Sequence, residues 1–128
     1  MPELDQSVII IGSGFAGIGM AIKLQQAGFP DIRILEKADQ LGGVWRDNTY
    51  PGAACDVPSH LYSFSFEPNP GWTRAFAPQS EILQYLNHCA DKYSIRQRIQ
   101  FGVEVEQACY QEDEQRWQEQ LKGGATLS

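Results

Sequence analysis

The sequence predicts an α/β fold built on a short parallel sheet, and three observations support this. Residues 7–11 (SVIII) are a nearly continuous apolar, β-branched run, as in a strand covered on both faces. Residues 15–27 follow with apolar side chains at helical spacing and stop at Gly28. Residues 31–35 (DIRIL) form a second strand that ends at Glu36. These segments predict one right-handed βαβ unit.

Residues 38–78 predict a long irregular connection. They contain five of the seven prolines and seven aromatic side chains. A disordered segment would lack those aromatic rings, so we expect an ordered loop. Long irregular connections inside a domain usually carry function.

The rest of the chain predicts a further helix and two strands. Residues 79–93 have apolar side chains at helical spacing, and residues 99–109 alternate loosely and predict one strand. A polar turn at 111–115 precedes a second strand at 116–121. Residues 123–124, both glycine, are expected to lead into a short tail.

Composition excludes several classes of protein. The 128 residues suit about one domain, and a net charge of −6 argues against nucleic-acid binding. No run approaches the roughly 20 apolar residues of a membrane span, and no basic segment precedes the first apolar run as in a signal peptide. Three cysteines without metal-type spacing predict neither a zinc site nor a disulfide framework, so we expect a cytoplasmic protein.

A glycine-rich loop joins the first strand to the first helix. Its pattern is GxGxxG, in the context that binds dinucleotides. Gly12 permits a tight turn, Gly14 lets a diphosphate approach the backbone, and Gly17 lets the helix pack close to the sheet. Amides of the first helical turn then face the phosphates. The candidate binding residues here are Gly12, Ser13, Gly14, Phe15, Ala16 and Gly17.

Glu36 is the expected ribose ligand, 19 residues after Gly17. Its carboxylate would accept hydrogen bonds from ribose hydroxyls and repel a 2′-phosphate, which favours FAD or NAD over NADP. The neighbouring Lys37 is a further candidate binding residue. The alternative is a tight strand–helix turn without a ligand, with Glu36 at the surface.

The residues after Glu36 carry a more specific signal. The string LGGVWRDNTYPGAACD resembles the N-terminal FAD-binding region of the flavin-containing monooxygenases, in particular the Baeyer–Villiger type. The segments SEILQYLNHCADKY, IQFGVEVEQA and DEQRW look like that family's continuation. The resemblance therefore covers the chain from about Val8 to Trp117, and it implies a Rossmann-like FAD-binding domain.

The resemblance also implies site residues. Those expected to line the flavin are Gly43, Val44, Trp45, Arg46, Asp47, Asp56 and Tyr62. Val105 is expected beside the adenine, and Ala54, Cys55 and Asp56 near the nicotinamide end of NADPH. Asp56 is the catalytic candidate, since its carboxylate would orient an active-site arginine; the alternative is a loop aspartate that caps a backbone amide. Cys55 has no adjacent basic residue, which favours a structural role over a redox one.

Residues 1–128 are expected to be only part of an FAD-binding domain. Family members are several times longer, and their NADPH-binding loop and remaining FAD-domain segments are absent here. In such relatives NADPH reduces the flavin, and one atom of O2 passes through a peroxyflavin to a ketone or to nitrogen or sulfur. The chain alone is expected to be inactive.

Two alternatives stay open at this point. One is a non-catalytic nucleotide-binding or interaction module, and the other is a different FAD- or NAD-linked oxidoreductase. The second is weakened because no CxxxxC redox pair follows the second glycine pair. The small organic substrate and the oligomeric state are not specified by the sequence.

Overall fold

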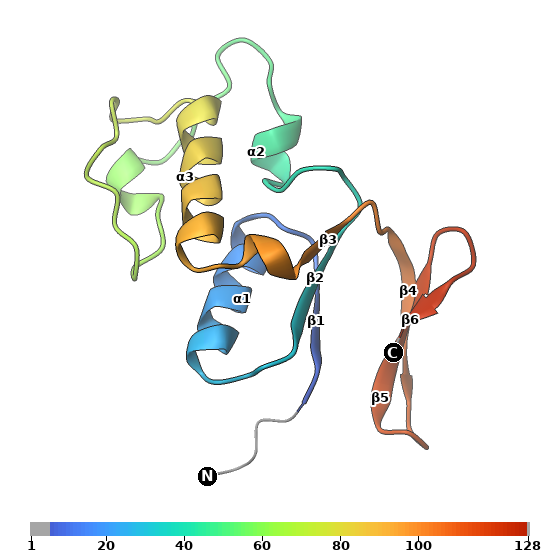
Figure 1. The fold of residues 1–128 in the computed structure, drawn as a ribbon. Coiled ribbons are helices and arrows are strands. Elements are labelled where there is room, and N and C mark those ends of the chain that lie inside the picture. Colours follow the sequence, from blue (N-terminus) through green and yellow to red (C-terminus); the bar gives the residue numbers. More distant parts are fainter. Residues whose placement is uncertain (1–5, 128) are drawn as a thin grey trace.

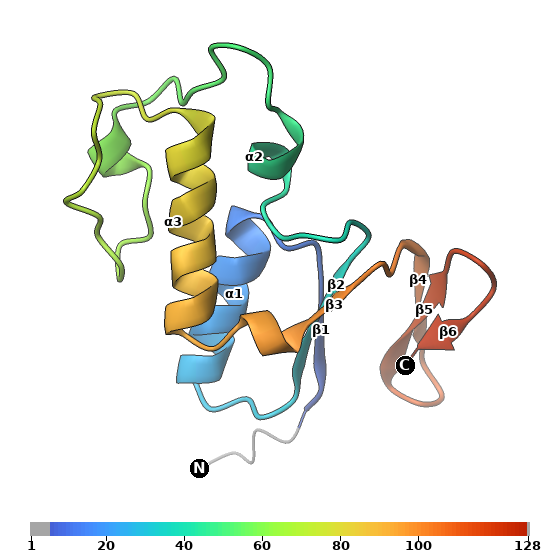
Figure 2. The same ribbon diagram turned by 45° about the horizontal axis from the view of Figure 1, so that its top comes forward.

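The computed structural model describes residues 6–127, apart from the side chain of His60. Its first layer is a parallel sheet in the order β1 (Val8–Ile11), β2 (Ile32–Glu36) and β3 (Ile99–Phe101). Helices α1 (Phe15–Gln26) and α3 (Gln79–Lys92) lie side by side on the same side of this sheet (Figure 1). The turned view in Figure 2 shows the same two-layer arrangement. The predicted α/β class and parallel sheet are confirmed.

The core lies between these two layers. Ile18, Ala21 and Ile22 of α1 are fully buried, as their helical spacing predicts. They pack against Ile34 of β2 and Leu86 of α3, which are also fully buried. The βαβ unit is therefore held by apolar burial, and its loops at the carboxyl ends of the strands are fixed in place.

The long connection is ordered and contains two short helices, α2 (Val44–Asp47) and η1 (Ser59–Leu61). Its aromatic rings pack on the start of α1: the Phe15 ring lies 4.9 Å from that of Tyr62 and 5.3 Å from that of Phe64. Tyr85 of α3 accepts a hydrogen bond from the Phe64 amide at 2.9 Å. This segment is thus attached to both helices.

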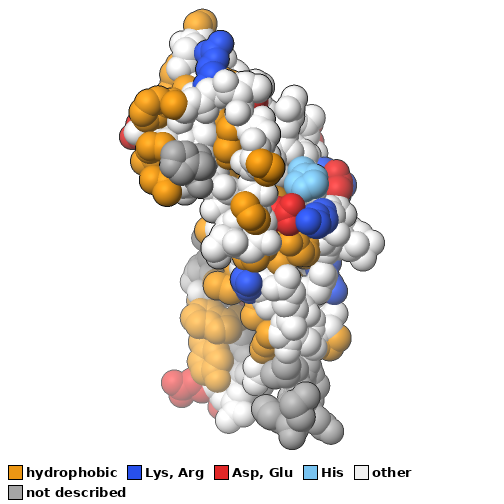
Figure 3. Space-filling model, turned by 90° about the vertical axis from the view of Figure 1, so that its left-hand side faces the viewer, with side chains coloured by type: hydrophobic (Ala, Val, Ile, Leu, Met, Phe, Trp, Pro, Cys, Tyr) orange, Lys and Arg blue, Asp and Glu red, His pale blue; other side chains and the backbone are white. Residues whose placement is uncertain are grey.

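A charged cluster fastens the same connection to α3. Glu67 is 8% exposed, and its carboxylate accepts hydrogen bonds from Lys92 Nζ at 2.7 Å and Tyr93 OH at 2.9 Å. His88 Nε2 lies 3.2 Å from the same carboxylate. Figure 3 shows basic, acidic and histidine side chains gathered on this face among apolar ones. Hydrogen bonds from Lys92 and Tyr93 lower the pKa of Glu67 to about 2, against the opposing effect of burial.

The prediction of one strand over 99–109 is wrong. The chain turns at Gly102, which has φ +72°, and begins a second, antiparallel sheet with β4 (Val105–Gln111). The short helix η2 (Arg96–Arg98) precedes β3. Loose alternation continues across the glycine, but a left-handed backbone there redirects the chain.

The second sheet contains β4, β5 (Arg116–Leu121) and β6 (Thr126–Leu127), all antiparallel. The predicted polar turn and the strand at 116–121 are confirmed. The prediction of a simple tail is wrong, because Gly123 and Gly124 have φ of +99° and +93° and turn the chain back onto β5. In Figure 1 this sheet stands beside the parallel sheet. No helix within residues 6–127 is long and apolar enough to cross a bilayer.

Candidate functional site

The first glycine loop joins β1 tightly to α1. Gly12 has φ +96°, so its turn needs a residue without a side chain. A Cβ on Gly17 would lie only 3.0 Å from the Gly12 carbonyl carbon and 3.5 Å from Ile10 Cγ2. The helix therefore starts in direct backbone contact with the end of the strand, as predicted.

Amides at the start of α1 have no partner in the helical hydrogen-bond ladder. The first helical hydrogen bond runs from Ile18 N to Gly14 O at 3.0 Å, so the preceding amides lie outside the helical ladder. Within the described residues no side chain caps this helix. A Cβ on Gly12 would meet nothing within 4 Å. Backbone donors beside open space suit an anionic group such as a diphosphate.

Glu36 lies directly beneath this loop. Its Oε1 accepts hydrogen bonds from Ser13 N at 3.1 Å and Ser13 Oγ at 2.5 Å, and its Oε2 accepts one from Ala38 N at 3.0 Å. Ser13 is fully buried and Glu36 is 4% exposed, whereas Lys37 is exposed. Burial raises the pKa of Glu36, but these hydrogen bonds and the charge of Arg46 outweigh it and leave the pKa lowered. Glu36 is thus an ionised, fixed acceptor.

The second glycine pair lies against the first loop. Gly42 N donates to Ser13 O at 3.0 Å, and Gly43 has φ +58°. A Cβ on Gly43 would lie 3.2 Å from Gly14 Cα. The two loops therefore meet backbone to backbone, and the positive φ and close approach at Gly43 favour a residue without a side chain there.

The short helix α2 follows this pair and presents one charged and one aromatic side chain to the site. The Arg46 guanidinium forms a bidentate pair with Asp47. Its Nη1 donates to Gln40 O at 2.8 Å and also lies 3.3 Å from Glu36 Oε1. Trp45 Nε1 donates to Tyr62 OH at 2.9 Å, and Gln79 Nε2 donates to the Trp45 carbonyl. Val44 is 63% exposed.

Residues 10–78, more than half of the chain, match the family of NAD(P)-binding Rossmann-like domains. The chain belongs to this family. Over 120 residues it is 49% identical to a Baeyer–Villiger monooxygenase of Streptomyces coelicolor. This match covers 93% of this chain and 23% of that protein. The expected resemblance to the N-terminal part of Baeyer–Villiger monooxygenases is confirmed.

Solved structures of monooxygenases share the fold of this Rossmann-like domain. An oxidized steroid monooxygenase bound to NADP matches with a TM-score of 0.87 and 38% identity, over 94% of this chain and 24% of the other. A complex of OTEMO with FAD and NADP matches with a TM-score of 0.87 and 31% identity, over 94% and 23%. The chain spans about a quarter of the length of these relatives.

Three further predicted residues, Ala54, Cys55 and Asp56, lie in the long connection after α2. Cys55 is 5% exposed and donates its amide to Ala77 O at 2.9 Å, and Ala54 pairs with Pro78 in an isolated antiparallel bridge. Asp56 is exposed, and among the described residues it accepts no hydrogen bond. The interpretation of Asp56 as a capping side chain therefore gains no support.

Val105 begins β4 and is half-buried. The segment before it is fixed to the end of β2, because Val103 N donates to Glu36 O and Gly102 N donates to Ala38 O, both at 3.0 Å. The second sheet thus starts next to the predicted ribose site.

Sequence reasoning missed the backbone amide of Ala38 and the side chain of Gln79, which hold Glu36 and Trp45. A backbone donor leaves no signal in the residue type. Gln79 is the first residue of α3, and its long-range contact with Trp45 has no periodic signature.

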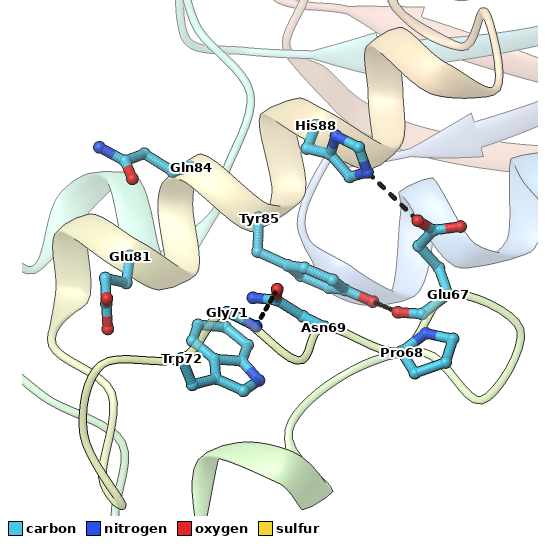
Figure 4. Close-up of a pocket in the computed structure, with 9 residues that line it drawn as sticks. All are labelled: Glu67, Pro68, Asn69, Gly71, Trp72, Glu81, Gln84, Tyr85 and His88. Atoms are coloured by element: carbon cyan, nitrogen blue, oxygen red, sulfur yellow. Dashed lines mark hydrogen bonds and ion pairs between the residues drawn. The ribbon is translucent and has the colours of Figure 1, made fainter.

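A pocket of about 300 Å³ lies elsewhere, between α3 and residues 67–72, and contains no predicted site residue. Figure 4 shows Tyr85 and Trp72 along it, with the hydroxyl of Tyr85 on the Glu67 backbone. Burial raises the pKa of Tyr85. Tyr85 attaches the aromatic connection to α3 through these contacts.

Proposed function

We propose that the chain binds FAD at the two glycine loops and forms the N-terminal part of a flavin-dependent monooxygenase. The observation that carries this proposal is the backbone contact between Gly14 and Gly43 above the buried pair of Ser13 and Glu36. One glycine loop suffices for a diphosphate, whereas a second loop pressed against it extends the site toward a longer ligand. A related structure with FAD and NADP supports the same choice of ligand.

Each part of the site then has a role in holding the cofactor. The amides that open α1 would bind the diphosphate, Glu36 would accept from the adenosine ribose, and Val105 would contact the adenine. Trp45 and Tyr62 would pack along the flavin end, where their mutual hydrogen bond fixes both rings. When bound, FAD supplies the redox chemistry and the activation of O2.

Asp56 is proposed to act through its carboxylate, by orienting an active-site arginine outside this chain. The full-length protein would take electrons from NADPH and add an oxygen atom to a ketone, or to nitrogen or sulfur, of a small organic molecule. Residues 1–128 make only part of the FAD-binding domain in this proposal, and we expect no turnover from them alone. A cytoplasmic location stays a prediction from composition.

Calorimetric titration of the purified chain with FAD, ADP and FMN tests the proposal. We expect binding of FAD and ADP, which carry the adenosine diphosphate half, and none of FMN, which lacks it. Absence of FAD binding would contradict the proposed site. Incubation with FAD, NADPH and a cyclic ketone should give no lactone, and steady lactone formation would contradict the predicted inactivity.

Two glycine variants isolate the contact between the loops. Gly43→Ala places a Cβ 3.2 Å from Gly14 Cα and should weaken FAD binding by at least about tenfold, or about 1.4 kcal/mol. Gly52→Ala is the matched control, because Gly52 also has a positive φ (+85°) in the same connection but has open space around it. Equal losses in both variants would mean that backbone strain, not the loop contact, decides affinity.

A further inference from the structure

The two oxygens of Glu36 differ in their free capacity for hydrogen bonds. Oε1 already accepts from Ser13 N and Ser13 Oγ, and Arg46 Nη1 lies 3.3 Å away. Oε2 accepts only from Ala38 N. A carboxylate oxygen has about two lone-pair sites, so Oε1 is saturated while Oε2 keeps one acceptor position.

Arg46 reaches this carboxylate from α2, the short helix that follows the second glycine pair. Its side chain is 13% exposed, and its position is fixed by the bidentate pair with Asp47 and by Gln40 O. A planar guanidinium held at these points keeps Nη1, which donates to Gln40 O, in a fixed place beside Glu36 Oε1, where the two groups form an ion pair. The resemblance places Arg46 along the flavin, whereas the structure directs its guanidinium to Glu36.

We propose that Arg46 is a positioning residue for the adenosine ribose, which holds Glu36 so that Oε2 alone accepts a hydrogen bond from one ribose hydroxyl. This inference rests on the proposed FAD site. Because α2 directly follows the second glycine pair, ribose recognition then depends on that pair staying packed against the first glycine loop. Glu36 then binds one of the two ribose hydroxyls rather than both.

Deoxy analogues of ADP test this assignment by calorimetry. The wild-type chain should bind one of 2′-deoxy-ADP and 3′-deoxy-ADP about tenfold more weakly than ADP, and the other within about twofold of ADP. Arg46→Gln should bind ADP about tenfold more weakly and discriminate between the two analogues by less than about twofold. Arg46→Lys keeps the positive charge but lacks the planar guanidinium with its several donors. Its ADP affinity and its discrimination should lie between those of the wild-type chain and of Arg46→Gln.

Arg33→Gln is the matched control, because it removes the same charge from an arginine whose pair with Asp31 is solvent-exposed. It should leave ADP affinity and discrimination unchanged. A purely structural role of Arg46 would weaken all three nucleotides equally and keep the discrimination. If Arg46→Gln does not fold, as judged by circular dichroism, Arg46→Lys decides by the same comparison.

The outcomes separate the two proposals. A wild-type chain that binds neither ADP nor FAD overturns the proposed function and this inference with it. A chain that binds ADP, but whose discrimination survives in the Arg46 variants, overturns the role of Arg46 alone. Equal losses with both deoxy analogues in the wild-type chain overturn the single acceptor position.

Discussion

The parallel-sheet region and the antiparallel sheet of this chain are stabilised in different ways. All twelve residues of the main buried cluster, from Ile18 to Ile99, belong to the first region. In the described part of the second, large apolar side chains such as Tyr110 and Trp117 are 49% and 56% exposed. The first region is held by burial and carries the glycine loops, whereas the second depends on strand pairing. Most of the proposed binding site therefore lies on the region with the buried core.

The largest effect should come from the core of the first region. Leu86→Ala keeps a good helix former in α3 but empties a fully buried position, so it should lower the free energy of unfolding by about 2–5 kcal/mol. Urea denaturation followed by circular dichroism measures this. Gln84→Ala, at an exposed position of the same helix, should change stability by less than about 0.5 kcal/mol. A loss of unfolding free energy as small as that of Gln84→Ala would contradict the view that the first region is held by its buried core.

A smaller effect should come from the charged cluster on α3. Glu67→Gln removes the carboxylate that Lys92 and Tyr93 bind and should cost about 1–2 kcal/mol at pH 7, given that Lys92 is half exposed. The pKa of Glu67 is lowered to about 2 in the folded chain, so its contribution is full above about pH 4.5. That contribution is lost as the pH falls toward 2.

The pH dependence provides the check on this cluster. Between pH 5 and 2 the wild-type chain should lose more stability than Glu67→Gln does, as measured by urea titrations at each pH. Glu112→Gln, an exposed carboxylate in the turn of the second sheet, should follow the wild-type profile. Parallel curves for the wild-type chain and Glu67→Gln would show that the cluster does not stabilise the fold.

The smallest effect should come from the second sheet. Trp117→Ala removes a cross-strand partner of Tyr110, whose ring centroid lies 5.5 Å away, and should cost about 0.5–1 kcal/mol. Tryptophan fluorescence would lose a probe, so thermal unfolding followed by circular dichroism is the measurement. A loss as large as that of Leu86→Ala would mean that this sheet carries a core of its own.

Much of the first region follows from sequence pattern. Apolar residues at helical spacing predicted α1 and α3, and short apolar runs predicted β1 and β2, each to within two residues. The glycine loop was predictable because Gly12 and Gly17 each answer a steric demand that the structure shows. Local sequence therefore specifies the local frame of the site.

The parts that sequence did not reveal depend on long-range contacts. His88 and Lys92 stand four residues apart on α3, but nothing in that spacing identifies Glu67 as their common partner. Arg46 likewise meets Glu36 only after the intervening turn has formed. The break at Gly102 was visible as a residue type, yet its left-handed backbone depends on how the two sheets are joined.

The contact between Gly14 and Gly43 limits what correlated substitutions among homologous sequences can reveal about such sites. No side chain takes part in it, so a larger residue at one position cannot be compensated by a smaller residue at the other. A saturation library covering both codons should keep glycine at position 43, where φ is +58° and a Cβ would lie 3.2 Å from Gly14 Cα, whatever residue stands at position 14, where a Cβ would lie at 3.7 Å. Contact maps inferred from correlated substitutions would then be blind to the meeting point that assembles this site.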